Sequence, residues 1–247
     1  MKRLLIRYLR IAGWLVFTVV VFMVLIEFTF YLTDVFAQRK AESLLQDVRN
    51  LRVGASTEDD VQMIVKRYGH ETHQRFDFSG CEGTVELHDI RLANTPANWF
   101  GLRYPFVRLG GVRFWQVDAF LATARDRVCH VGFRFQPLPR HGNEWLDVSA
   151  TWPSGSRPAQ ENYGMSFLRI HDGRQLRVYV WNGASEEERR RAFEFNLSCI
   201  TTWSGCNAVC EVMPLAWHDY EKKARAENKP IPADETDNPQ CNQSPRS

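Results

Sequence analysis

The sequence predicts an α+β protein with an N-terminal transmembrane helix, two short helices, an antiparallel β-sheet built from hairpins, and C-terminal helices. Three observations lead to this prediction. An apolar run stands near the N-terminus, β-rich segments separated by turn residues occupy the middle of the chain, and helical periodicity with capping residues flanks them on both sides. A chain of 247 residues that is 44% apolar is ample for a packed core.

The apolar run covers residues 11–32 and is interrupted only by Glu27 near its outer end, where a carboxylate can reach water. A helix of this length reaches about 33 Å, which matches a hydrocarbon core of about 30 Å. The basic residues that precede the run predict a cytoplasmic segment over residues 1–10; they are Lys2, Arg3, Arg7 and Arg10. We therefore expect a single-pass protein of the cell membrane, with the lipid bilayer as a partner and an extracytoplasmic domain, periplasmic in a bacterium.

A cleaved signal is the alternative to a permanent anchor. Val35, Phe36 and Ala37, followed by Gln38, resemble a signal-peptidase site. The apolar run is longer than the usual signal-peptide core of about 7–15 residues, which favours the anchor.

The charge balance beyond the run excludes a polyanion-binding class. Four basic residues precede the run and two acidic residues, Glu27 and Asp34, lie in or just after it, so that 27 of the 31 basic and 27 of the 29 acidic residues follow. A neutral domain has no field that steers nucleic acid, and we expect no nucleic-acid partner.

Cysteine usage agrees with an oxidising compartment, because all six cysteines follow the apolar run. The favoured pair is Cys199 with Cys206, which flank a short turn, and Cys81 and Cys129 are further disulfide candidates. Cys241 is a poor candidate, since it stands in a Pro-rich segment with few apolar residues. A zinc site made of Cys199, Cys206, Cys210 and His218 is the alternative, although its spacing matches no common zinc pattern.

The exported α+β domain is expected over residues 38–225 and begins with helices. Apolar residues recur at helical spacing from Ala41 to Leu51, and Gly54 follows where a helix ends. Ser56 or Thr57 then begins a second helix that ends at Gly69. Ser185 begins a later helix that we expect to run to about Cys199.

Strands are expected between these helices, and a last helix follows them. The hairpin turns are predicted at Arg125-Asp126 and at Asp172-Gly173. The last helix runs from about Asn207 to Ala226 and is kinked or split by Pro214. Residues 226–247 are expected to form a disordered tail. The expected strands are Gln74–Phe78, Thr84–Leu92, Arg113–Ala124, Arg127–Gln136, Trp145–Trp152 and the two arms of the hairpin around Asp172.

The segment LRVGASTEDDVQMIVKRYG, from Leu51 to Gly69, resembles the helix-helix opening of BamE-type envelope lipoproteins, in which two helices pack on an antiparallel sheet. This resemblance implies a role in envelope assembly. The segment RRRAFEFNLSCITTWSGC, taken with the anchor and hairpins, resembles bacterial membrane-anchored extracytoplasmic proteins of uncharacterised activity. The chain differs from the lipoproteins in having a membrane helix and no lipobox cysteine near its N-terminus.

The common catalytic signatures are absent from the sequence: it contains no GxSxG, Walker, GxGxxG or HExxH motif. The densest polar constellation is His70, His73, Glu86 and His88, whose imidazoles and carboxylate are metal-ligand types. The alternative is ordinary exposed histidines in a loop. A second ambiguous group is the aromatic residues between Trp99 and Phe106, which belong either to the core or to a contact surface for a partner or the bilayer.

Two functional hypotheses follow. The first is a noncatalytic binding or envelope-assembly module with an envelope protein as partner, without catalytic residues, metal or cofactor. The second is an envelope enzyme with a His/Glu metal site, and convergence of those side chains around one ion distinguishes it from the first. A Golgi-type glycosyltransferase ranks third, because no Asp-x-Asp motif occurs.

Overall fold

A computed structural model describes residues 2–69, 71–76, 81–93, 115–137, 145–155, 162–170, 173–202, 205–231, 235 and 241. Within these ranges the side chains of residues 2–9, 27, 30, 71–76 and 170 are not described. The expectation for Glu27 therefore lies outside the described side chains. The aromatic residues from Trp99 to Phe106 lie outside the described residues altogether.

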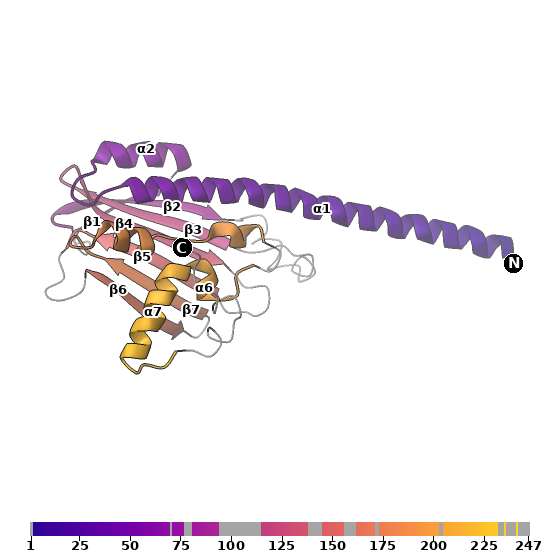
Figure 1. Cartoon of the computed structure of the whole chain (residues 1–247). Coiled ribbons are helices and arrows are strands. Elements are labelled where there is room, and N and C mark those ends of the chain that lie inside the picture. Colours follow the sequence, from indigo (N-terminus) through magenta and orange to yellow (C-terminus); the bar gives the residue numbers. More distant parts are fainter. Residues whose placement is uncertain are drawn as a thin grey trace.

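The first helix, α1 (Lys2–Asn50), is one uninterrupted element of 49 residues. At 1.5 Å per residue it is about 73 Å long, roughly twice the thickness of a bilayer core. It lies along the sheet with its C-terminal part and projects far beyond it with its N-terminal part (Figure 1). The sequence predicted two elements here, a membrane helix and a separate short helix, and the structure joins them without a break.

The sheet has seven strands among the described residues, in the order β1-β2-β3-β4-β5-β7-β6. The first five follow chain order as an antiparallel meander. Strand β6 then forms the outer edge and returns antiparallel to β7. The strands are β1 (Glu71–Phe76), β2 (Thr84–Ala93), β3 (Trp115–Ala124), β4 (Arg127–Pro137), β5 (Trp145–Pro153), β6 (Tyr163–Ile170) and β7 (Gly173–Val180).

The expected all-antiparallel sheet is wrong at one place, because β5 and β7 run parallel and pair from Trp145 opposite Gly173 to Thr151 opposite Tyr179. In the β6–β7 hairpin the second strand, β7, lies next to β5, and β6 lies at the edge of the sheet. Strands β5 and β7 therefore run in the same direction. The α+β class holds, with a mixed sheet in place of an antiparallel one.

One of the two hairpin turns is at its predicted position and the other is not. Arg125 and Asp126 both have positive φ, at 53° and 60°, as a tight two-residue hairpin turn requires. In the second hairpin Ile170 pairs with Gly173, so the connection is residues 171–172, one position earlier than predicted. These two residues lie outside the described part of the chain.

Gly173 is required for a close backbone approach, not for a turn. A Cβ at this position would lie 2.2 Å from the carbonyl oxygen of Trp145 on the neighbouring strand. We expect Gly173→Ala to lower the free energy of unfolding by about 1–3 kcal/mol, since backbone on both sides must shift. Chemical denaturation measures this change. Gly164→Ala in β6 is the matched control, because its Cβ would meet a Trp181 ring atom at an ordinary 3.4 Å; equal losses in both variants would contradict the close-approach explanation.

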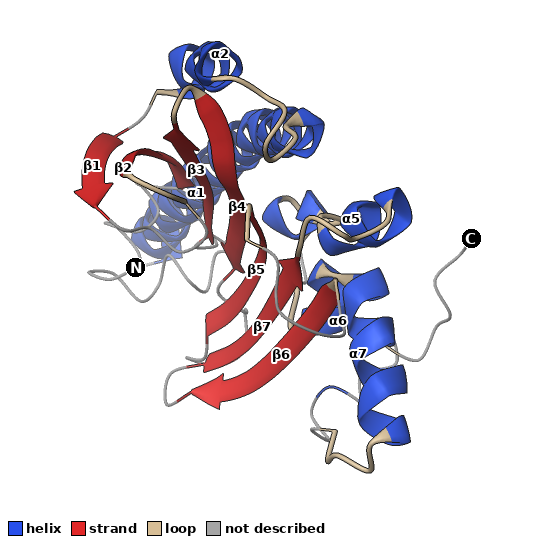
Figure 2. Ribbon diagram, turned by 90° about the vertical axis from the view of Figure 1, so that its left-hand side faces the viewer, coloured by secondary structure: helices blue, strands red, loops and turns tan. Residues whose placement is uncertain are grey.

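The helices gather on one face of the sheet (Figure 2). Helices α2 (Glu58–Tyr68), α5 (Glu186–Ala192), α6 (Val209–Val212) and α7 (Pro214–Ala226) and the 3-10 helix η1 (Leu197–Ile200) accompany α1. Their apolar faces share one large core with the sheet, in which Phe133, Leu176 and Trp217 are almost fully buried. A small second cluster around Val85 and Leu87 lies on the opposite face of β2.

Capping residues explain where α2 and α5 begin, and a proline explains where α7 begins. Thr57 precedes α2, and its backbone N–H donates to the Asp60 carboxylate at 2.8 Å. Ser185 caps α5 by accepting from the Glu188 N–H at 3.2 Å. Helix α5 ends at Ala192, earlier than the predicted Cys199. Pro214 splits the last helix as expected, standing at the first turn of α7.

Candidate functional site

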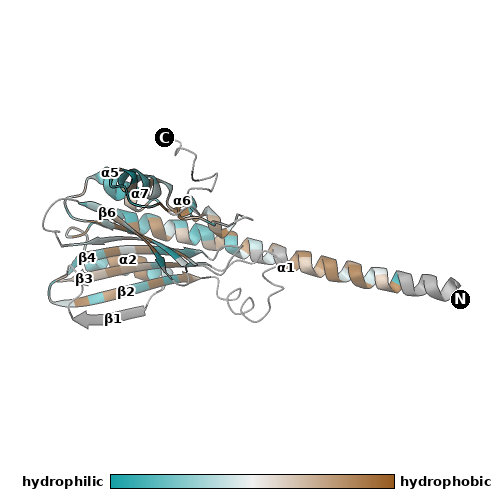
Figure 3. Ribbon diagram, turned by 90° about the horizontal axis from the view of Figure 1, so that it is seen from below, coloured by the Kyte–Doolittle hydropathy of each residue, from teal (hydrophilic) through white to brown (hydrophobic). Residues whose placement is uncertain are grey.

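The projecting part of α1 is apolar and uncovered by the rest of the described chain. The most apolar window of this helix has a mean hydropathy of 2.5 and none of its residues is buried. Trp14 is 70% exposed and Phe22 63%. In Figure 3 this part is mostly hydrophobic, whereas the part over the sheet alternates between hydrophilic and hydrophobic residues. This part of the helix is long and apolar enough to cross a membrane, and none of its most apolar window is buried in the core of the domain.

The apolar part joins the domain without a linker. The indole N–H of Trp115, at the start of β3, donates to the Asp34 carboxylate at 3.2 Å. Ala37 packs against the core, and the Thr201 hydroxyl donates to the Gln38 side-chain oxygen at 2.6 Å. The predicted face from Ala41 to Leu51 is buried. The domain is therefore fixed to the helix from Asp34 onward.

All six cysteines are in disulfides, which agrees with an oxidising compartment. The pairs are Cys81–Cys129, Cys199–Cys206 and Cys210–Cys241. The pair Cys199–Cys206, predicted from its short connection, is confirmed. The zinc interpretation of Cys199, Cys206, Cys210 and His218 is wrong, because its three thiols are oxidised.

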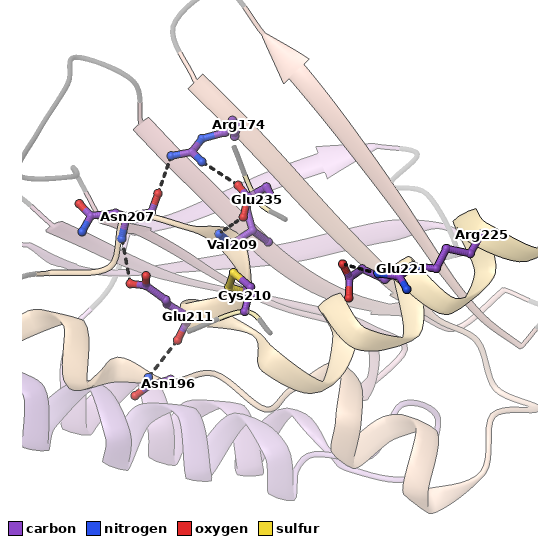
Figure 4. The surroundings of a disulfide bond; sticks show 10 residues. Arg174, Asn196, Asn207, Val209, Cys210, Glu211, Glu221, Arg225 and Glu235 are labelled. Carbon is purple, nitrogen blue, oxygen red and sulfur yellow. Dashed lines mark hydrogen bonds and ion pairs between the residues drawn. A yellow bond between two sulfur atoms is a disulfide. The ribbon is translucent and has the colours of Figure 1, made fainter. Parts of the chain in front are cut away.

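Cys241 was judged a poor disulfide candidate, and the structure corrects this. The expected tail over residues 226–247 is also not free along its length. Glu235 is fully buried, where one carboxylate oxygen accepts from Arg174 at 2.8 Å and the other from the Val209 N–H at 2.9 Å (Figure 4). Arg174 also donates to the Asn207 carbonyl at 2.6 Å. An ion pair and a disulfide therefore attach this segment to α6 and β7.

The predicted site residues His70, His73, Glu86 and His88 are only partly brought together. His70 lies outside the described residues. His73 is in β1 opposite Leu87, whereas Glu86 and His88 pair with Gln74 and Thr72. The side chain of His73 lies outside the described side chains, so only Glu86 and His88 of this group can be placed relative to one another.

Glu86 and His88 meet a residue that the sequence did not suggest, Glu58 at the start of α2. The His88 Nε2 atom lies 3.2 Å from Glu58 Oε1 and 4.0 Å from Glu86 Oε1. His88 is fully buried, while the side chains of Glu58 and Glu86 are 24% and 42% exposed. The three ligand atoms lie within 4.8 Å of one another. One imidazole and two carboxylates form a donor set that can hold a divalent metal ion.

A polar network crosses the sheet on the face opposite the helices. Arg134 on β4 donates to both oxygens of Asp147 on β5 at 2.7 Å, and Gln175 on β7 donates to the same carboxylate at 2.5 Å. This hydrogen bonding raises the pKa of Arg134. A second ion pair on this face joins Arg91 on β2 to Asp118 on β3 at 2.9 Å. The alternation of charged and apolar residues was visible in the sequence, but the partners depend on strand order and could not be found from it.

His130 lies on this network face beside the disulfide half Cys129. Burial lowers the pKa of His130 to about 4, so the imidazole is neutral at pH 7. A thiolate–imidazole pair with Cys129 does not form, since Cys129 is bonded to Cys81.

A cleft of about 190 Å³ lies between the C-terminal end of α1 and α5, and arginines line it together with Trp152 and Glu186. Arg52 and Arg189 hydrogen-bond Glu186 and lower its pKa to about 2. Arg189 also lies over the Trp152 ring, 5.0 Å from its centroid. The basic triplet of α5, Arg189 to Arg191, is therefore not only a solvated face, since Arg189 also packs on the sheet. Its arginines are occupied by internal carboxylates, which argues against an anion site in this cleft.

Comparison of the chain with models of protein families, with curated proteins and with solved structures gave no match.

Proposed function

We propose that this chain is a membrane-anchored extracytoplasmic binding module, whose single membrane helix continues into the domain and holds it at the bilayer surface. One observation supports this most strongly: the apolar window of α1 is entirely uncovered, although the domain has a complete core of its own. An exposed apolar stripe of this length is unfavourable in water and favourable in a bilayer.

The orientation rests on two independent features. The basic residues are concentrated before the apolar run, which favours a cytoplasmic N-terminus. The three disulfides all lie in the domain, which favours an oxidising compartment for that side. A permanent anchor is favoured over a cleaved signal, because cleavage after Ala37 would remove Asp34 and its hydrogen bond to Trp115.

A noncatalytic binding role, with an envelope protein as partner, fits the arrangement of two helices packed on a sheet and the resemblance of residues 51–69 to BamE-type proteins. The alternative function is an envelope enzyme with a metal centre, and the convergence of Glu58, Glu86 and His88 favours it. Affinity capture from detergent extracts under stringent washing separates the two classes. Failure to recover any stoichiometric partner would count against the binding role.

Membrane anchoring and orientation are tested on the full-length chain. We expect the protein to stay in the membrane pellet after alkaline carbonate extraction, because the interaction is hydrophobic and insensitive to charge. A C-terminal reporter that is active only outside the cytoplasm should be active, and its cytosolic counterpart inactive. Recovery of the intact chain in the carbonate supernatant, or activity of the cytosolic reporter, would refute the proposal.

A further inference from the structure

The start of α2 and strand β2 bring together three metal-ligand side chains that are distant in the sequence. Glu86 and His88 are two residues apart on β2 and therefore point to the same face of the sheet. Glu58 is the first residue of α2. That helix is held over the sheet because Thr57 bridges to Arg127 and the Glu58 N–H donates to the Asp126 carbonyl at 3.2 Å. Backbone contacts thus fix the place of Glu58 relative to β2 independently of its side chain.

The separations suit a shared ion. Zinc bonds to nitrogen and oxygen ligands are about 2.0–2.2 Å long, so tetrahedral ligand atoms are about 3.3–3.6 Å apart. The Nε2 atom of His88 is 3.2 Å from the Glu58 oxygen and 4.0 Å from the Glu86 oxygen. Side-chain movements of less than about 1 Å would therefore bring all three atoms to bonding distance of one ion.

The cluster is buried on the side of His88 and accessible to solvent on the side of the two carboxylates. His88 has no exposed surface, and its neighbours on the same strand and face continue into the main core through Ile90. Glu58 and Glu86 are partly exposed, so an ion can enter from solvent past the carboxylates. Gln62, one turn after Glu58, donates to Glu58 Oε1 at 2.6 Å and orients that carboxylate.

We propose that Glu58, Glu86 and His88 bind a divalent transition-metal ion of the zinc type. An imidazole among the ligands favours zinc and its neighbours over magnesium and calcium, which prefer all-oxygen sites. The two carboxylates together compensate the charge of a dication. Three protein ligands leave a fourth position for water or for a donor from a bound partner. The ion would connect α2 to the sheet. It is independent of the membrane anchoring, and its presence would favour the enzyme candidate over a metal-free binding module.

The test uses the full-length protein in detergent micelles, without an affinity tag and after dialysis against chelator. Isothermal titration with ZnCl₂, checked by elemental analysis after gel filtration, should give about one tight zinc per chain. Glu58→Gln and Glu86→Gln should each weaken zinc binding at least about tenfold. Glu82→Gln is the matched control, since Glu82 is an exposed carboxylate that pairs with Arg125 outside the cluster, and zinc binding should be unchanged.

His88→Gln should abolish stoichiometric binding, but its buried position makes unfolding an alternative cause of that loss. The two glutamate variants alter partly exposed groups, so their circular dichroism should match that of the parent chain while zinc binding falls. Absence of stoichiometric zinc in the parent chain would overturn the proposal. So would zinc binding of parental strength in both glutamate variants, or a site that takes calcium in preference to zinc.

Discussion

Replacement of Arg174 by Met is expected to lower the free energy of unfolding by about 3–5 kcal/mol, because it leaves a buried carboxylate without its cation. The Arg174 side chain is 9% exposed and that of Glu235 is fully buried, so water cannot replace the lost partner. The guanidinium also holds the Asn207 carbonyl, which would lose its donor. Met keeps most of the aliphatic volume of Arg, so that the loss reports on charge more than on packing.

Denaturant unfolding in detergent micelles measures this effect, with Arg177→Met as the matched control. Arg177 is on the same strand, exposed and on the opposite face, and its replacement should cost less than about 1 kcal/mol. The double variant Arg174→Met, Glu235→Leu should recover much of the loss, since it removes both charges together. Equal losses in Arg174→Met and Arg177→Met would show that the pair does not hold the C-terminal segment to the domain.

The sequence was most informative where a structure depends on local chemistry. Ser185 identified the start of α5, and the start of α2 was narrowed to Ser56 or Thr57, of which Thr57 is the cap, because a capping side chain acts within three residues. Pro214 identified the split of the last helix for the same reason. The burial of the face from Ala41 to Leu51 followed from its spacing alone.

The features that the sequence did not predict depend on contacts between distant segments. The parallel pairing of β5 with β7 results from the order in which a hairpin is inserted, and strand alternation does not encode that order. Nothing in the composition around Cys241 indicates its partner, and the ion pair that holds the same segment joins Glu235 to Arg174, 61 residues away in the sequence. The continuity of α1 differs from the two predicted elements, an apolar run over residues 11–32 and a helical face from Ala41 to Leu51, because residues between them are helical as well.

In the candidate metal cluster, one part was predictable from local sequence and the other depends on contacts between distant segments. The i and i+2 spacing of Glu86 and His88 in a strand was sufficient to place them on one face. Glu58 could not be selected from the acidic run at the start of α2, because its choice depends on how that helix lies across β2. His73 stays a prediction, because its side chain is outside the described part of the chain.

Removal of the Cys81–Cys129 disulfide should cost about 4 kcal/mol, since it closes a loop with a sequence separation of 48 residues. The same chain-entropy relation gives about 2.5 kcal/mol for Cys199–Cys206, whose separation is 7. Cys81 and Cys129 also complete the small apolar cluster on the face of the sheet away from the helices. That cluster is too small to hold the start of β2 by burial alone, so the bond should be its main support.

The comparison is between two double variants, Cys81→Ala with Cys129→Ala and Cys199→Ala with Cys206→Ala, both unfolded by denaturant under nonreducing conditions. All four cysteines are almost fully buried, so the cavities created are similar and the difference reports on loop length. The first variant should be the less stable by about 1.5 kcal/mol. A reversed order would mean that loop closure does not dominate here. If the order holds, a chain retained in a reducing compartment would lose its largest single covalent contribution, which ties the stability of the domain to the export that its N-terminal helix favours.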